Sequence, residues 1–289
     1  MYPSSSFQGR RGFTLVELLI SLVLGALIIG VVLQFVTGQT RLTSMQSSRE
    51  EVQQNARGAL EMVASDLRGS IASGVARGDA DAIELLLPRR WGVVCSQVGT
   101  ARTTVVFPDL PGQVTPAGVG AGLLLQQTPG AAWRPALPVL ATVATATPVG
   151  LGTCAGLNVT GNVVAFQLDG ANHPGVTPGA TAALYQRVRY DVRTSRGAQW
   201  IHRSNGMSDA NTFIMQPLAG PVDTNAGGVS FTYFAGNPPT PLPAAPGTGA
   251  AAANLSQVRL RVRIKSRQGG SASQVEFDSA TVQIRNDNN

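Results

Sequence analysis

Residues 10–36 read RRGFTLVELLISLVLGALIIGVVLQFV, two arginines and a glycine followed by a long apolar run whose one charged side chain is Glu17. A helix rises about 1.5 Å per residue, so roughly 20 apolar residues reach across the hydrocarbon core of a bilayer. The stretch therefore predicts a single membrane-spanning helix near the start of the chain.

This run differs from a cleaved secretory signal, because it is longer than a typical h-region and no small-residue A-x-A site closes it. Glu17 needs a physical reason, since an acidic side chain near the bilayer centre is unfavourable by roughly 2.5 to 3.5 kcal/mol. One alternative is an ordinary signal anchor in which Glu17 reaches toward the lipid headgroups.

Residues 10–22, RRGFTLVELLISL, resemble the prepilin cleavage and methylation motif of type IV pilins and type II secretion pseudopilins. The shared features are a basic leader, Gly12, the aromatic Phe13 and Glu17 at the fifth mature position. The resemblance implies that a prepilin peptidase cuts between Gly12 and Phe13 and methylates the new amino terminus at Phe13. It also implies that Glu17 pairs with the α-amine of a neighbouring subunit, which makes a carboxylate tolerable in apolar surroundings.

Helical periodicity continues after the span. Apolar residues recur at steps of three, four and seven, namely Leu42, Met45, Val52, Ala56, Leu60, Val63, Leu67 and Ile71. We expect one helix from about Phe13 to Ser70, preceded by a leader peptide at 1–12. The first half of the helix, 13–36, is the transmembrane or filament-core segment, and the second half, 37–71, is amphipathic. Because Arg10 and Arg11 precede the span, the positive-inside rule predicts that residues 72–289 lie outside the inner membrane.

Residues 72–289 are predicted to form an extracytoplasmic β-rich domain, because short apolar runs alternate there with turn residues. Candidate strands are 82–87, 103–107, 123–126, 139–143 and 162–168, and a hairpin is predicted around a turn at 195–197. A second group of strands is predicted at 228–236, 255–267 and 275–286, whereas 108–150 and 237–253 read mainly as long loops.

The predicted fold class is therefore α+β, with a long N-terminal helix packed on one or more antiparallel sheets. The last three strands would form an antiparallel sheet whose apolar side is covered by the amphipathic half of the helix. This order of elements resembles the larger minor pilins of the PilW type and the J-type pseudopilins.

The chain has two cysteines, Cys95 and Cys154. In a compartment that permits disulfides, a bridge between them would close a loop of about 60 residues and stabilise the fold by about 4 kcal/mol on the chain-entropy model. The alternative is two unpaired buried thiols. With only His173 and His202 to join them, these cysteines make a poor zinc site.

Five basic residues alternate with apolar residues near the C-terminus and form what is called here the basic row: Arg259, Arg261, Arg263, Lys265 and Arg267. In a strand, all five project from one face. The pattern repeats in Arg187, Arg189 and Arg193. Such a row could attract DNA phosphates, with a steep salt dependence, or it could be a solvated sheet face whose charges discourage edge pairing.

Catalysis finds little support in the sequence, since G-x-S-x-G, Walker P-loop and H-E-x-x-H motifs are missing. His173 is predicted in a turn and His202 as a packed or surface residue. Asp209 and Asp223 lie in predicted loops, but no ligand spacing there supports a calcium site. We therefore expect a protein that is not an enzyme and has no cofactor.

Three hypotheses for function follow. The first is a minor pilin of an initiating or tip complex in a type IV pilus, and the second is a J-type pseudopilin of a type II secretion system. The third is a membrane-anchored binding or adhesive module that uses the basic row or the long loops. The expected partners are the prepilin peptidase, other major and minor pilins, and DNA. The precursor would cross the inner membrane once before moving to a pilus at the cell surface or to the periplasm.

Overall fold

A computed structural model describes residues 14–70, 74–98, 102–108, 121–126, 133–135, 146–154, 156–167, 176–208, 212–224, 227–248, 252, 255–266 and 275–284. By its internal contacts the chain divides into two compact units, Met1–Glu50 and Glu51–Asn289. The boundary lies inside the single long helix, so the end of that helix belongs to the second unit, which also holds the strands.

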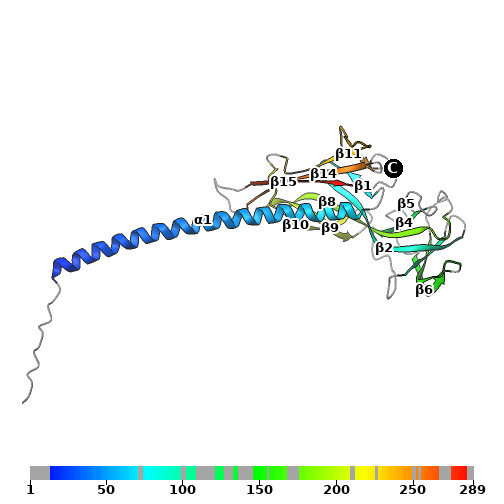
Figure 1. The fold of residues 1–289 in the computed structure, drawn as a ribbon, viewed down its shortest axis with the longest axis horizontal. Helices are drawn as coiled ribbons and strands as arrows, with labels where there is room; N and C mark the ends of the chain where they lie inside the picture. The colour runs from blue at the N-terminus through cyan, green and yellow to red at the C-terminus, as the bar shows by residue number, and fades with distance from the viewer. Residues whose placement is uncertain are drawn as a thin grey trace, which may run out of the picture. The chain divides into compact units, whose positions relative to one another are not determined.

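The helix α1 spans Leu15–Gly69, within two residues of the predicted bounds (Figure 1). Thr14 begins it, because the Thr14 Oγ1 and carbonyl oxygen both accept from the backbone N–H of Glu17, at 3.3 and 3.1 Å. This is the N-cap arrangement, which satisfies a donor that the first helical turn leaves unpaired. Ser70 ends the helix, where its Oγ donates to the Leu67 carbonyl at 2.6 Å.

The strands of the second unit form two antiparallel sheets in the described residues. Their bounds are β1 Val75–Gly78, β2 Ile83–Val98, β3 Arg102–Phe107, β4 Ala121–Gln126, β5 Trp133–Pro135, β6 Ala146–Cys154, β7 Val159–Gln167, β8 Thr181–Ser195, β9 Ala198–Met207, β10 Phe213–Ala219, β11 Val229–Ala235, β12 Thr240–Pro241, β13 Gly247–Thr248, β14 Leu255–Lys265 and β15 Val275–Gln283. The larger sheet has the main order β10-β9-β8-β2-β3-β7-β6, and the smaller has the order β12-β11-β14-β15.

Two long strands, β2 and β8, run through the whole of the larger sheet. They pair with each other from Ile83↔Tyr190 to Val93↔Thr181. On its other side β8 pairs first with β4 and then with β9, while β2 pairs first with β1 and then with β3. Because each strand changes neighbours along its length, the two ends of the sheet can pack around different cores.

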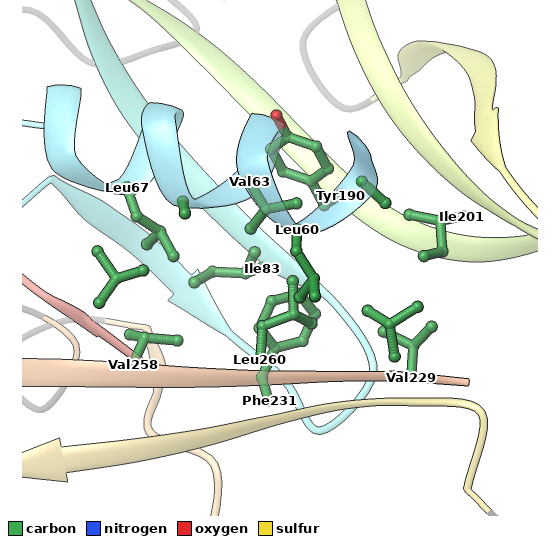
Figure 2. Packing of buried hydrophobic residues seen from close by; sticks show 14 of the residues in the cluster. Leu60, Val63, Leu67, Ile83, Tyr190, Ile201, Val229, Phe231, Val258 and Leu260 are labelled. Atoms are coloured by element: carbon green, nitrogen blue, oxygen red, sulfur yellow. The ribbon is translucent and has the colours of Figure 1, made fainter. Parts of the chain in front are cut away.

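The first core joins the helix to both sheets. Figure 2 shows Leu60, Val63 and Leu67 of α1 packed with side chains of both sheets. The larger sheet contributes Ile83, Tyr190 and Ile201, and the smaller contributes Val229, Phe231, Val258 and Leu260. The α+β fold and the cover of the last strands by the amphipathic helix are therefore confirmed. The number of sheets, which the sequence left open, is two in the described residues.

The second core lies at the other end of the larger sheet. It is built from side chains of β2, β3, β4, β7 and β8, among them Val94, Val105, Leu123 and Val164. Phe107 and Phe166 meet edge to face, with ring centroids 6.3 Å apart. This core contains no residue of α1, so its stability depends on how the sheet itself folds over.

A disulfide between Cys95 and Cys154 connects β2 to β6, the pairing expected for these two cysteines, with 5.1 Å between their Cα atoms. In the sheet order β3 and β7 lie between these strands. Three strand spacings in a flat sheet would separate β2 and β6 by roughly 14 Å. The sheet therefore curls strongly enough to bring its edge strand β6 back to β2, and the disulfide holds this closure.

The hairpin predicted around 195–197 is confirmed, because Ser195 pairs with Ala198 across Arg196 and Gly197. Both central residues have positive φ, 52° and 75°, as a two-residue turn of this kind requires. The prediction for 82–87 was too short, since β2 continues to Val98. The loop prediction for 108–150 missed β5 and the start of β6. The strand predicted at 139–143 lies outside the described residues.

Candidate functional site

Glu17 lies in the first turn of α1. Its backbone N–H is held by Thr14, and its carbonyl oxygen accepts from Ser21 Oγ at 2.8 Å. An acidic side chain at this end of a helix is stabilised by the macrodipole. Among the described residues the Glu17 carboxylate takes part in no ion pair.

The helix around Glu17 is apolar on every side. Its large apolar side chains from Leu15 to Val36 are between 51% and 79% exposed in the described structure. By length and composition this helix is long and apolar enough to cross a membrane. So much exposed apolar surface is unfavourable in water, and it needs either lipid or other helices as cover.

Hydroxyl groups further along the same helix are satisfied within it. Thr37 Oγ1 donates to the Leu33 carbonyl at 2.9 Å, Thr43 Oγ1 to the Gln39 carbonyl at 3.0 Å and Ser48 Oγ to the Ser44 carbonyl at 2.8 Å. A hydroxyl that donates a hydrogen bond to a backbone carbonyl of the preceding turn can enter an apolar environment without an unsatisfied donor. The hydroxyl-rich segment after Val36 is therefore compatible with burial among other helices.

Gly12 and Phe13, the predicted cleavage and methylation residues, lie outside the described residues, as do Arg10 and Arg11. Of the residues predicted for processing and assembly, the structure therefore describes Glu17 alone. Glu17 is the third residue of α1, which begins at Leu15.

The basic row lies on β14 as predicted, on the face opposite the first core. Val258, Leu260, Val262 and Ile264 are buried, whereas the basic residues between them are partly or fully exposed. Arg267 lies outside the described residues. The alternation confirms that Arg259, Arg261, Arg263 and Lys265 share the outward face of the smaller sheet.

Two members of the basic row already have partners on their own sheet face. Arg263 forms an ion pair with Asp223 at 3.5 Å. The Arg259 guanidinium lies 5.1 Å from the ring centroid of Phe234, and its Nε donates to Thr281 Oγ1 at 3.2 Å. The ion pair with Asp223 lowers the positive charge available to a polyanion such as DNA, whereas the partners of Arg259 are neutral and leave its charge in place.

The second basic group belongs to β8, on the other sheet, and it is paired more completely. Arg187 forms an ion pair and a hydrogen bond with Glu84, a carboxylate that is 2% exposed. Arg189 and Arg193 both pair with Asp191, at 3.1 and 2.9 Å. A buried carboxylate requires such partners, because its desolvation is otherwise uncompensated.

A polar cluster that the sequence did not reveal ties α1 to the larger sheet. Tyr190 Oη donates to Asp66 Oδ2 at 2.6 Å, and the Nε and Nη2 of Arg203 donate to the same oxygen at 3.0 and 2.9 Å. Asp66 is 124 residues from Tyr190 and 137 from Arg203 along the chain. No local pattern marks contacts of such sequence separation.

His202 is buried, and its Nδ1 lies 3.0 Å from the Trp200 carbonyl oxygen, so it is a packed residue. Within the described residues no group of three or more His, Cys, Asp or Glu could hold a metal ion. Asp223, one of the two aspartates considered for calcium, is instead engaged with Arg263. His173 and Asp209 lie outside the described residues.

Comparison with known families finds that residues 8–33 match the prokaryotic N-terminal methylation motif. This match supports a type IV pilin-like protein, of a pilus or a pseudopilus, whose precursor is anchored in the membrane. The motif implies processing by a prepilin peptidase and assembly with other pilins. No curated protein and no solved structure matches the chain.

Proposed function

We propose that the chain is a minor pilin that joins an initiating or tip complex of a type IV pilus. In this proposal residues 1–12 are removed as a leader, Phe13 is methylated, and residues 13–36 move from the bilayer into the helical core of a filament. The globular part, 72–289, then projects from that core outside the inner membrane.

The observation that carries the proposal is Glu17, a carboxylate on an exposed apolar helix without an ion-pair partner in the described chain. In an apolar filament core such a charge is costly, unless an ammonium group lies beside it. The α-amine of a neighbouring pilin, at Phe13 of a second copy or at the first residue of another subunit, supplies that group. Pairing then selects the axial position at which two subunits fit.

The test replaces Glu17 by glutamine, which removes the charge and keeps the shape. We expect Glu17→Gln protein to be processed to a mature chain that begins at Phe13, yet to be lost from sheared filaments. Mass spectrometry of the mature N-terminus and immunoblots of the filament fraction measure the two steps separately. Glu50→Gln, an exposed acid on the same helix, is the matched control and should enter filaments normally.

Filaments that contain Glu17→Gln protein at the wild-type level would refute the assembly role. A purified membrane protein that still begins at Met1 would refute the processing step. The same chemistry also serves a J-type pseudopilin, so the choice between pilus and secretion system is made by identifying the subunits that crosslink to this one in the membrane.

Nucleic-acid binding by the basic row is a separate prediction, and the ion pair of Arg263 with Asp223 weighs against it. Replacing Arg259, Arg261, Arg263, Lys265 and Arg267 by glutamine tests it directly. If the row binds DNA, the substituted protein should lose salt-sensitive DNA binding and DNA uptake, while pili stay intact. Normal uptake in cells with intact pili would leave the row as a solvated sheet face.

A further inference from the structure

A cavity of about 380 Å³ opens on the face of the larger sheet that carries the charged side chains of β8, opposite the first core. It is lined by Arg77, Glu84, Arg187, Arg189, Arg193, Thr212 and Phe213, and it is called here the arginine cavity. Its volume lies within the range of about 300 to 1,000 Å³ that is typical of ligand sites.

Strand register places these charges together. Glu84 of β2 pairs with Arg77 of β1 on one side and with Arg189 of β8 on the other. Residues paired across neighbouring strands project from the same face. Arg187 and Arg193 join the row from the same face of β8, since side chains two residues apart in a strand share a face.

The charges of the cavity do not cancel. Four guanidinium groups, those of Arg77, Arg187, Arg189 and Arg193, face the carboxylates of Asp79, Glu84 and Asp191, which leaves one positive charge. A net charge of this size, in a site with a buried carboxylate, matches one negative group better than a chain of phosphates.

Among the described residues, the terminal nitrogens of Arg189 have no acceptor within hydrogen-bond distance. Arg189 uses its Nε for Asp191, whereas its two terminal nitrogens lie 3.9 Å from Asp79 and 3.9 Å from Glu84. These distances are longer than a hydrogen bond, and the Arg189 side chain is only 21% exposed. Arg77 likewise bonds Asp79 through Nε alone, as far as the described residues show. The terminal nitrogens of Arg189 therefore have hydrogen-bonding capacity left for an acceptor that enters the cavity beside them.

The ring of Phe213 forms an apolar wall of the arginine cavity. The Arg187 and Arg189 guanidinium groups lie 5.3 and 6.0 Å from the centroid of the Phe213 ring. Phe213 is the first residue of β10, which pairs only with β9 in the described chain and so ends the sheet.

We infer that the arginine cavity binds the carboxylate side chain of an acidic segment of a protein partner. The carboxylate accepts from the terminal nitrogens of Arg189, and the half-exposed Arg77 and Arg193 close on it from the rim. The inference does not depend on the assembly proposal, because it concerns the globular unit and leaves Glu17 untouched.

The test uses the full chain in detergent micelles and a labelled, end-blocked peptide of alternating valine and glutamate, with its glutamine counterpart as the matched probe. Fluorescence anisotropy should show the glutamate peptide binding at least about tenfold more tightly, since a hydrogen bond to a charged group contributes roughly 1.5 to 3 kcal/mol. Arg77→Gln and Arg193→Gln should each weaken binding about tenfold. Arg261→Gln, an exposed arginine of the other sheet, should leave it unchanged.

Both test positions are about half exposed, so their substitution should leave the fold intact, which thermal unfolding of each variant checks. Equal binding of the two peptides would overturn the inference, as would equal weakening by Arg261→Gln. Free glutarate that binds as tightly as the peptide would show a small-anion site without a polypeptide partner. A short single-stranded oligothymidylate that displaces the peptide at lower concentration would show a nucleic-acid site instead.

Discussion

At the residue scale, the contact between helix and sheet depends on three polar side chains as well as on the apolar core. Asp66 accepts from both Tyr190 and Arg203 on one oxygen, and the Arg203 guanidinium lies 5.8 Å from the centroid of the Tyr190 ring. The cluster lets the polar face of α1 end against the sheet without an unsatisfied carboxylate.

Substitution in this cluster should destabilise the fold in a graded way. Arg203→Gln removes the charge-assisted hydrogen bonds to Asp66 and should lower the free energy of unfolding by about 2 kcal/mol, whereas Tyr190→Phe removes one hydroxyl and should cost about 1 kcal/mol. Urea unfolding of the full chain in detergent measures both. Arg261→Gln serves as the surface control, and equal values for all three variants would contradict a structural role for the cluster.

Buried tyrosines predict how stability changes at high pH. Burial raises the pKa of Tyr185, Tyr190 and Tyr233, and the hydrogen bond and charge of Asp66 raise that of Tyr190 further. In the unfolded chain a tyrosine loses its proton near pH 10. Above about pH 10 the unfolded state has released protons that the folded state retains, so the free energy of unfolding falls as pH rises. At a pH well below about 10 these tyrosines are protonated in both states and do not affect the free energy of unfolding.

The expected slope is up to about 1.4 kcal/mol per pH unit for each such tyrosine. Urea unfolding between about pH 9 and pH 11 measures it, and Tyr233→Phe should make the slope shallower by one tyrosine. A free energy of unfolding that stays constant across this window would show that the three hydroxyls ionise equally in both states.

At the element scale, one glycine of the helix and one of a strand differ in the space around their Cα atoms, so alanine at the two positions should change stability in opposite directions. A Cβ at Gly58 of α1 would meet nothing within 4 Å, whereas one at Gly92 of β2 would lie 2.7 Å from Val105 Cγ1 and 2.7 Å from the Val106 carbonyl oxygen. Gly58→Ala should therefore raise the free energy of unfolding by about 0.5 to 1 kcal/mol. Gly92→Ala should lower it. Chemical denaturation of the two variants checks the opposite signs, and a destabilised Gly58→Ala protein would contradict the open helix face.

Elements whose signal is local were predictable from the sequence. The helix follows from its apolar run and periodicity, and the β8–β9 hairpin follows from a turn in which Arg196 and Gly197 both adopt positive φ. The later part of β2 was not predictable, because Pro88, Arg89 and Arg90 look like a break. Pairing with β8 carries the strand past them through a register shift between Pro88 and Arg90.

The candidate sites divide in the same way. Glu17 and the basic row could be predicted from the sequence, because each is defined by the spacing of residues along a single helix or strand. The arginine cavity was not visible, because Arg77, Glu84 and Arg189 become neighbours only when β1, β2 and β8 pair in register. Register between strands about a hundred residues apart depends on the whole sheet, so no window of sequence contains it.

At the scale of the whole molecule, the two largest of the three buried apolar clusters in the described residues share the strands β2 and β8. One contains the end of α1 and both sheets, and the other lies inside the curled part of the larger sheet that the Cys95–Cys154 disulfide closes. Opening the disulfide therefore acts directly on the second core and only indirectly on the first, so the two should differ in local stability.

The double variant Cys95→Ser/Cys154→Ser should lose about 4 kcal/mol of stability, because the bridge no longer restricts a loop of about 60 residues in the unfolded chain. Hydrogen exchange followed by mass spectrometry should show the larger increase in β3 and β7, while β14 and the part of α1 from Val52 to Leu67 stay better protected. Wild-type protein treated with a reductant should reproduce this pattern. An equal increase in hydrogen exchange across all these elements would contradict the prediction. It would mean that the two cores unfold as one cooperative unit, coupled through the shared strands β2 and β8.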